Sequence, residues 1–191
     1  MQTIIWDVDD VLNNLTRDWF EGYWLKNNPA CMVLFAQIDK IPPHEIFHIS
    51  REKYLETLDE FRIKHGESLQ PDMDVLEWFR AHGHQFRHAV LTATPRFYAP
   101  CSAQWVFKHF GDWIRTYHFV PSKRTHDDFP CYDANKAGFL RTLGNVDIFI
   151  DDNESHINDA KKDGIRTLLF PQPWNSNSSE SVVDFLKKII V

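Results

Sequence analysis

Near its start the chain reads Thr3-Ile4-Ile5-Trp6-Asp7-Val8-Asp9-Asp10, a short apolar run followed by a cluster of acids. An apolar run of this length, bounded by charge, predicts a buried β-strand that ends in carboxylates. Asp7 and Asp9 flank a single residue, so on an extended backbone their side chains lean to the same side. Three carboxylates within four residues repel one another unless a cation lies among them. The stretch therefore predicts an oxygen-lined Mg²⁺ site, with one carboxylate left for covalent or proton-transfer chemistry.

Two further apolar runs also end in polar residues. Ala89-Val90-Leu91 leads into Thr92-Ala93, and Val146-Asp147-Ile148-Phe149-Ile150 leads into Asp151-Asp152. Strands separated by helical segments predict a parallel sheet, whose ligand site lies beyond the carboxyl ends of the strands. An acidic loop after an edge strand, the alternative for the first stretch alone, does not account for the other two. We therefore expect five polar side chains at one edge of the sheet: Asp7, Asp9, Thr92, Asp151 and Asp152.

The segment between the first two of these strands has helical periodicity and no clear strand signal. It includes a predicted helix from Arg51 to His65 that ends at Gly66. A structureless loop of this length is implausible in a compact domain. We therefore predict an α/β fold, a Rossmann-like parallel sheet flanked by helices with a small helical cap inserted after the first strand. The predicted core is 1–12 and 85–191, and the predicted cap is 13–84.

In order and chemistry, these motifs resemble those of the haloacid dehalogenase (HAD) superfamily of aspartate-nucleophile phosphohydrolases. The first motif of that superfamily, an Asp-x-Asp after a hydrophobic strand, matches Asp7-Val8-Asp9. The second, a Thr or Ser after a strand, matches Thr92, and the fourth, an acidic pair, matches Asp151-Asp152. The third is a single lysine, for which Lys136 at a predicted helix start is the first choice and Lys123 the rival. The resemblance spans nearly the whole chain.

Within the superfamily the chain is most similar to the 5'(3')-deoxyribonucleotidase group. The similarity lies in Ile150-Asp151-Asp152-Asn153, then Gly164, then Leu169-Phe170-Pro171-Gln172-Pro173-Trp174-Asn175. One position departs from the group. The residue after the second motif Asp is usually Gly there and is Asp10 here, which adds bulk and charge where Gly leaves room. This departure bears more on the substrate than on the type of reaction.

The resemblance implies a Mg²⁺-dependent phosphomonoester hydrolase that forms an aspartyl-phosphate on Asp7, with Asp9 as general acid and base. It implies that the phosphate oxygens are held by the Thr92 hydroxyl, the Ala93 amide and Lys136. The implied metal ligands are Asp7, the backbone carbonyl of Asp9, and Asp151 or Asp152. The implied substrate is a small phosphorylated metabolite such as a deoxyribonucleoside monophosphate. The alternative is a catalytically silent protein of this fold that binds a ligand or partner.

Composition narrows the classes of function. With 43% apolar residues among 191, the chain can form a sizeable core. A net charge of −6 argues against a partner such as a nucleic-acid polymer, which needs a basic face. No run approaches the ~20 apolar residues that span a bilayer, so no membrane partner is expected. The first strand begins at once, which predicts no signal peptide. Three cysteines without a CxxC pattern favour a reducing compartment, the cytoplasm.

Overall fold

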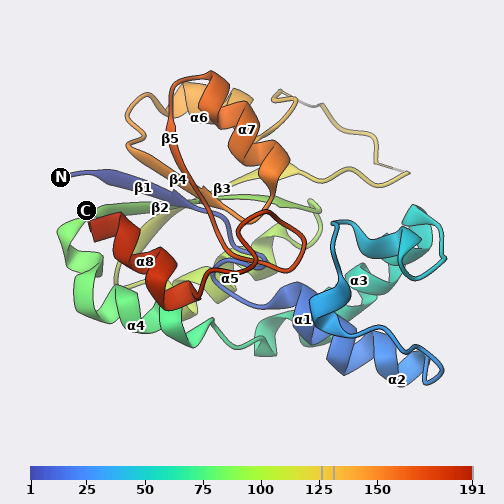
Figure 1. Cartoon of the computed structure of the whole chain (residues 1–191). Helices are drawn as coiled ribbons and strands as arrows, with labels where there is room; N and C mark the ends of the chain where they lie inside the picture. The colour runs from blue at the N-terminus through green and yellow to red at the C-terminus, as the bar shows by residue number, and fades with distance from the viewer. Residues whose placement is uncertain (126, 131, 191) are drawn as a thin grey trace.

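One five-stranded parallel sheet forms the centre of the computed structural model, which describes residues 1–125, 127–130 and 132–190 (Figure 1). The strand order is β3-β2-β1-β4-β5, and every neighbouring pair is parallel. The strands are β1 (Thr3–Trp6), β2 (Arg87–Thr94), β3 (Ile114–Pro121), β4 (Ile148–Asp151) and β5 (Arg166–Leu169). The predicted Rossmann-like α/β fold is confirmed. In the described residues, no helix combines the length and apolar character that crossing a membrane requires.

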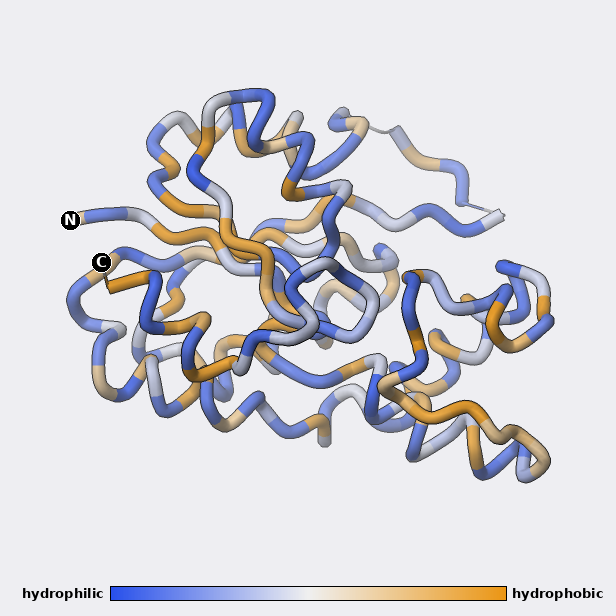
Figure 2. The backbone as a smooth tube through the Cα atoms, in the orientation of Figure 1, coloured by the Kyte–Doolittle hydropathy of each residue, from blue (hydrophilic) through white to orange (hydrophobic). Residues whose placement is uncertain are grey.

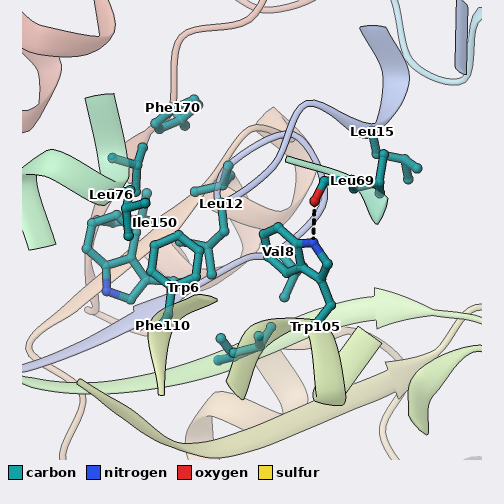
Figure 3. Packing of buried hydrophobic residues seen from close by; sticks show 14 of the residues in the cluster. Trp6, Val8, Leu12, Leu15, Leu69, Leu76, Trp105, Phe110, Ile150 and Phe170 are labelled. Atoms are coloured by element: carbon teal, nitrogen blue, oxygen red, sulfur yellow. Dashed lines mark hydrogen bonds between the residues drawn. The ribbon is translucent and has the colours of Figure 1, made fainter. Parts of the chain in front are cut away.

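Helices cover both faces of the sheet, because neighbouring residues of a strand point to opposite sides. In β1, Trp6 belongs to the larger apolar cluster and Ile5 to the smaller one. Figure 1 shows α6 and α7 on one face of the sheet and α4, α5 and α8 on the opposite face. These helices are α4 (Met73–His82), α5 (Ala99–Phe110), α6 (Lys136–Leu143), α7 (Glu154–Lys162) and α8 (Val182–Ile190). Apolar residues concentrate in the strands (Figure 2), and Figure 3 shows Trp6 packed among Leu76, Phe110 and Ile150.

β2 is longer than predicted. The sequence places Thr92 after the strand, whereas β2 continues to Thr94 and pairs Thr92 with Phe119 of β3. Threonine is β-branched and packs well on a pleated surface, so two threonines at this point extend a strand rather than end it. Thr92 consequently lies inside β2, near its carboxyl end.

The insertion after β1 has its own aromatic packing. A helical run comprises α1 (Leu15–Trp19), one wide turn (Phe20–Trp24) and α2 (Leu25–Asn27), and it is followed by α3 (Arg51–His65). Phe47 packs against aromatic residues of this run, with ring centroids 5.8 Å from Trp19, 5.7 Å from Phe20 and 4.9 Å from Trp24. These aromatic side chains are buried, so they form the interior of the insertion.

The chain enters and leaves the insertion at adjacent points. Asn13 bridges to Pro71, and the Asp72 amide donates a hydrogen bond to the Leu12 carbonyl at 2.8 Å. Beyond this point α4 packs on the core, where Phe79 lies 5.0 Å from Trp6 between ring centroids. The predicted division into 1–12 and 85–191 against 13–84 stays a prediction. We propose that the cap ends before α4, near residue 71.

His88 of β2 is buried beneath this aromatic packing as a neutral imidazole. Its Nδ1 accepts a hydrogen bond from Trp6 Nε1 at 3.0 Å, and its Nε2 donates to the Gly83 carbonyl at 2.8 Å. Burial lowers the pKa of His88 to about 4, although the Gly83 carbonyl opposes this shift. Protonation would place a second donor opposite the Trp6 N–H.

We predict that His88 makes the fold sensitive to acid. Between pH 6.5 and 4 the unfolded chain binds a proton that the folded imidazole refuses, so stability falls as pH falls through this window. The pH-dependent loss due to His88 is about 3 kcal/mol. Urea unfolding of wild type and His88→Gln from pH 7 to 4 measures it, with exposed His84→Gln as control. An equal pH dependence in wild type and His88→Gln would contradict the assignment.

Candidate active site

The carboxyl ends of β1 and β4 lie side by side at the centre of the sheet. The Asp7 amide, directly after β1, donates to the Ile150 carbonyl of β4 at 2.9 Å. The order β3-β2-β1-β4-β5 makes this pair the point where the chain connections turn to opposite sides. In open α/β sheets, ligands bind at such a switch point.

Three buried acids and one buried lysine meet there. Carboxylate oxygens of Asp7, Asp151 and Asp152 all lie within 4.8 Å of one another. Lys136 Nζ lies 2.7 Å from Asp7 Oδ2 and 2.7 Å from Asp151 Oδ2, and its side chain is only 1% exposed. Lys136 is the first residue of α6, whose start Asn135 caps by accepting from the Gly138 amide at 2.9 Å. The rival Lys123 lies instead 5.5 Å from the Phe129 ring centroid.

The surroundings shift the pKa values of the three acids in opposite directions. Burial raises the pKa of Asp7 to about 6, although Lys136 opposes the rise. Burial and the neighbouring Asp151 raise the pKa of Asp152 well above its ordinary value. Burial would also raise the pKa of Asp151, but Lys136 and then His156 lower it to about 2. One ammonium therefore leaves the trio short of positive charge. Carboxylates that share a small volume favour a hard divalent cation, and the donor set fits one.

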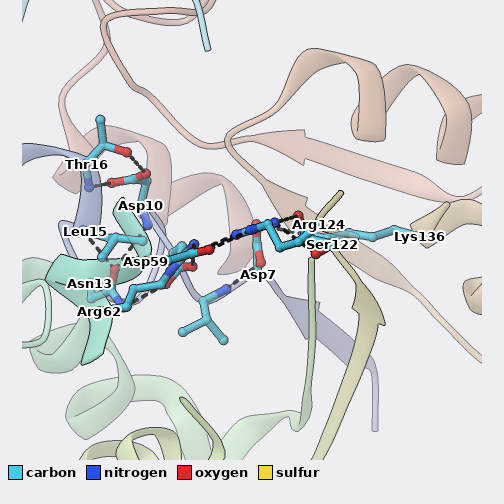
Figure 4. Close-up of polar contacts among 12 residues, drawn as sticks. Asp7, Asp10, Asn13, Leu15, Thr16, Asp59, Arg62, Ser122, Arg124 and Lys136 are labelled. Atoms are coloured by element: carbon cyan, nitrogen blue, oxygen red, sulfur yellow. Dashed lines mark hydrogen bonds and ion pairs between the residues drawn. The ribbon is translucent and has the colours of Figure 1, made fainter. Parts of the chain in front are cut away.

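Asp9 lies apart from this trio and contacts the insertion. Its Oδ2 accepts from Arg62 Nη2 of α3 at 2.8 Å. Arg62 Nη1 lies 3.2 Å from Asp59 Oδ1, and Asp59 in turn pairs with Arg124, which follows β3. Figure 4 shows Arg62, Asp59 and Arg124 joined in a row by these contacts. The carboxylate of Asp9 therefore belongs to an ion-pair chain that joins α3 to the core.

Asp10, which replaces the usual glycine of the motif, adopts a backbone conformation that is typical of glycine. Its φ is +63°, in the left-handed region that glycine adopts freely and aspartate tolerates. Its carboxylate accepts hydrogen bonds from the backbone N–H and the hydroxyl of Thr16 (Figure 4). Burial raises the pKa of Asp10 to about 7, the Thr16 hydrogen bonds oppose the rise, and Asp9 adds to it. The side chain thus turns to α1 rather than to Lys136.

Side chains of the loop after β5 donate hydrogen bonds to the loops that contain Asp10 and Asp152. Gln172 Nε2 donates to the Asp10 carbonyl at 2.7 Å, and Trp174 Nε1 donates to Asp152 Oδ2 at 2.8 Å. Asn175 Nδ2 donates at 2.8 Å to the Asp152 carbonyl. Sequence reasoning gave these three side chains no role. The sequence does place two amide side chains next to a tryptophan, a combination that can be buried only with hydrogen-bond partners. That pattern could have indicated that Gln172, Trp174 and Asn175 bind polar groups inside the protein.

Thr92 and Ala93 lie near the carboxyl end of β2, the strand beside β1. Thr92 is buried, and Ala93 is half-buried. Among the described residues, no hydrogen bond joins the Thr92 hydroxyl to the acids. The structure thus brings Asp7, Lys136, Asp151 and Asp152 into direct contact or close approach, with Asp9 bound to Arg62 at their side. His156, which sequence reasoning missed, lies 3.2 Å from Asp151 through Nδ1.

No protein-family model and no curated protein matches the chain by sequence. Solved structures do match over nearly its whole length. A haloacid dehalogenase-like hydrolase from Streptococcus pneumoniae has a TM-score of 0.65 at 12% identity, covering 100% of this chain and 97% of that one. The chain has the haloacid dehalogenase-like fold.

Two further neighbours agree with this fold. A predicted phosphatase from Clostridium acetobutylicum has a TM-score of 0.65 at 15% identity, covering 99% of this chain and 98% of that one. A predicted phosphoglycolate phosphatase from Haemophilus somnus has a TM-score of 0.61 at 14% identity, with the same coverages. Identities this low establish the shared fold alone, so the chemistry must be argued from the residues of the site.

We predict that replacing Lys136 by Met destabilises the protein by about 3–5 kcal/mol, because it leaves two buried carboxylates without their cation. Urea unfolding in metal-free buffer measures the loss. Lys162→Met is the matched control, since Lys162 also pairs with an aspartate, Asp159, but is 75% exposed. We expect little change in the control. If both variants unfolded at the same urea concentration, the buried ion pairs would not support the site.

Proposed function

We propose that this protein is a phosphomonoester hydrolase of the haloacid dehalogenase type. The observation that carries the proposal is the Asp7 carboxylate at the switch point, 2.7 Å from the Lys136 ammonium and beside Asp151 and Asp152. A carboxylate in that position can act as a nucleophile, and the cation beside it offsets the charge of an anionic substrate. Structural neighbours described as hydrolases and phosphatases support the proposal.

In the proposed reaction, Asp7 attacks phosphorus and displaces the alcohol, which divides one difficult displacement into two steps. Asp9 donates a proton to the departing oxygen and later accepts one from the water that cleaves the aspartyl-phosphate. Lys136, the Thr92 hydroxyl and the Ala93 amide hold the non-bridging oxygens, where charge shifts during transfer. We assign these roles because each residue lies near the carboxyl end of a strand or at the start of α6.

Mg²⁺ is the proposed cofactor. Asp7, Asp151 and Asp152 would hold it, together with the backbone carbonyl of Asp9, which suits a cation that prefers oxygen ligands. When bound, it would supply positive charge that reduces the repulsion between the carboxylates and a phosphate.

We propose a deoxyribonucleoside monophosphate as the substrate, on the resemblance of the motifs to the 5'(3')-deoxyribonucleotidase group, and the cytoplasm as the compartment. The segment from Leu169 to Asn175 supports the nucleotidase proposal because it carries that resemblance and also holds Asp10 and Asp152. The alternative is a catalytically silent binding protein. The buried acids argue against this alternative. Burying several carboxylates together destabilises a fold, and a protein without catalytic activity would gain nothing from keeping them.

We predict Mg²⁺-dependent release of phosphate that Asp7→Asn lowers by about 10³-fold or more, since the variant loses its nucleophile. The measurement is a panel of deoxynucleoside 5'- and 3'-monophosphates, ribonucleotides, sugar phosphates and p-nitrophenyl phosphate, with and without Mg²⁺. Exposed Asp112→Asn is the matched control and keeps wild-type turnover. Absence of Asp7-dependent turnover on every ester would refute the hydrolase and favour the silent binding protein.

A further inference from the structure

Arg62 is a residue of the insertion that reaches the proposed general acid. Its side chain is 7% exposed, and its Nη2 donates to Asp9 Oδ2 at 2.8 Å across 53 residues of sequence. In the proposed reaction the ester oxygen of the leaving group must also come within hydrogen-bond reach of Asp9, roughly 2.6–3.2 Å. The guanidinium and the leaving group therefore flank the same carboxylate.

The Nε atom of Arg62 is a buried donor without an acceptor. Nη2 donates to Asp9 and Nη1 donates to Asp59, whereas Nε has no hydrogen-bond partner among the described residues. Buried donors are nearly always paired, so this one needs an explanation. The guanidinium is a planar fork, and Nε and Nη2 share one of its edges. An acceptor for Nε would therefore lie close to Asp9 Oδ2, the atom that Nη2 contacts.

Asp59 is already bound by both arginines, because Arg124 contacts both of its carboxylate oxygens and Arg62 reaches it through Nη1 rather than Nε. Arg124 Nε lies 2.6 Å from Asp59 Oδ2, and Arg124 Nη2 lies 2.7 Å from Asp59 Oδ1. Both guanidiniums already contact the Asp59 carboxylate. An uncharged oxygen can therefore satisfy the unfilled donor of Arg62 without burying a second anion.

We propose that Arg62 determines substrate specificity by donating its Nε–H to an uncharged oxygen, ether or hydroxyl, on the carbon next to the ester carbon of the leaving group. The inference rests on the proposed function, because it uses Asp9 as the group that protonates the ester oxygen. It names a substrate class, phosphate esters of alcohols that carry oxygen on the adjacent carbon. Sugar phosphates and nucleoside 5'-monophosphates belong to this class, and simple alkyl and aryl phosphates do not.

The test is a cycle that pairs an enzyme variant with a substrate variant. 2-Methoxyethyl phosphate and butyl phosphate differ only in one ether oxygen replaced by CH₂. Deoxythymidine 5'-monophosphate and its carbocyclic analogue, in which CH₂ replaces the ring oxygen, form the second pair. We expect wild type to prefer the oxygen-bearing member of at least one pair by about 10- to 100-fold in kcat/KM, the range for a hydrogen bond to a charged group. In Arg62→Met this ratio falls toward one.

Two controls separate specificity from general damage. Lys64→Met removes an exposed cation from the same helix and keeps the wild-type ratio. Arg62→Lys keeps the charge but loses the planar edge, so its ratio falls as it does in Arg62→Met, and it decides the question if Arg62→Met does not fold. Asp7-dependent turnover of p-nitrophenyl phosphate by the Arg62 variants shows that the phosphate site is intact.

The inference is overturned if wild type shows no preference within either pair, or if the Arg62 variants keep the wild-type ratio. Failure of the proposed function gives a different result, namely no Asp7-dependent turnover of any ester by wild type. A uniform loss on all esters with an unchanged ratio would assign Arg62 to holding Asp9 and would refute its contact with the leaving group.

Discussion

The ammonium of Lys136 is the constraint on which the site depends. It is buried between Asp7 and Asp151 at 2.7 Å from each, where neither partner can be replaced by water. A buried charge without a partner is far more costly than a buried pair, so the strand ends and the start of α6 are held in one arrangement. The two carboxylates come from neighbouring strands and the lysine from a helix on one face of the sheet. The ion pairs therefore couple the sheet order to the chemistry of the site.

One lysine does not neutralise three buried acids, so the site lacks positive charge. The pKa values of Asp7 and Asp152 are raised first by burial and then by the nearby carboxylate of Asp151. Hydrogen bonds from Trp174 and Asn175 stabilise the Asp152 loop without adding charge, and Gln172 does the same for the Asp10 carbonyl. Neutral donors fix the geometry but leave the charge unbalanced. That combination would favour binding of a cation at the proposed site, since the cation would find its ligands already positioned.

The fold and the acids could be predicted from the sequence because both are local signals. Short apolar runs mark the strands, and each acid motif follows directly from one of them. Lys136 was within reach because Asn135 is a recognisable helix cap. Arg62 and Asp59 were not. Three residues apart in a charged helix, they look like an exposed ion pair, and only the fold brings Asp9 and Arg124 to them. Asn175 and Asn177 could not be assigned a role either, because their amides donate to the carbonyls of Asp152 and Leu169, contacts that only the fold creates.

The insertion and the acids cannot vary independently, because the insertion contacts the site at two places. Arg62 binds Asp9, and Phe35 packs edge-on against Trp174 with ring centroids 6.1 Å apart. Trp174 in turn donates to Asp152. A shift of α3 away from the sheet would remove the cation from Asp9, whereas a shift of the segment around Phe35 would loosen the packing of the indole that orients Asp152. Substitutions inside the aromatic interior of the insertion therefore act on two different acids through two different routes, one electrostatic and one steric. The proposed hydrolysis would need both acids in register, so the packing around Phe47 would contribute to it although none of its side chains carries a charge.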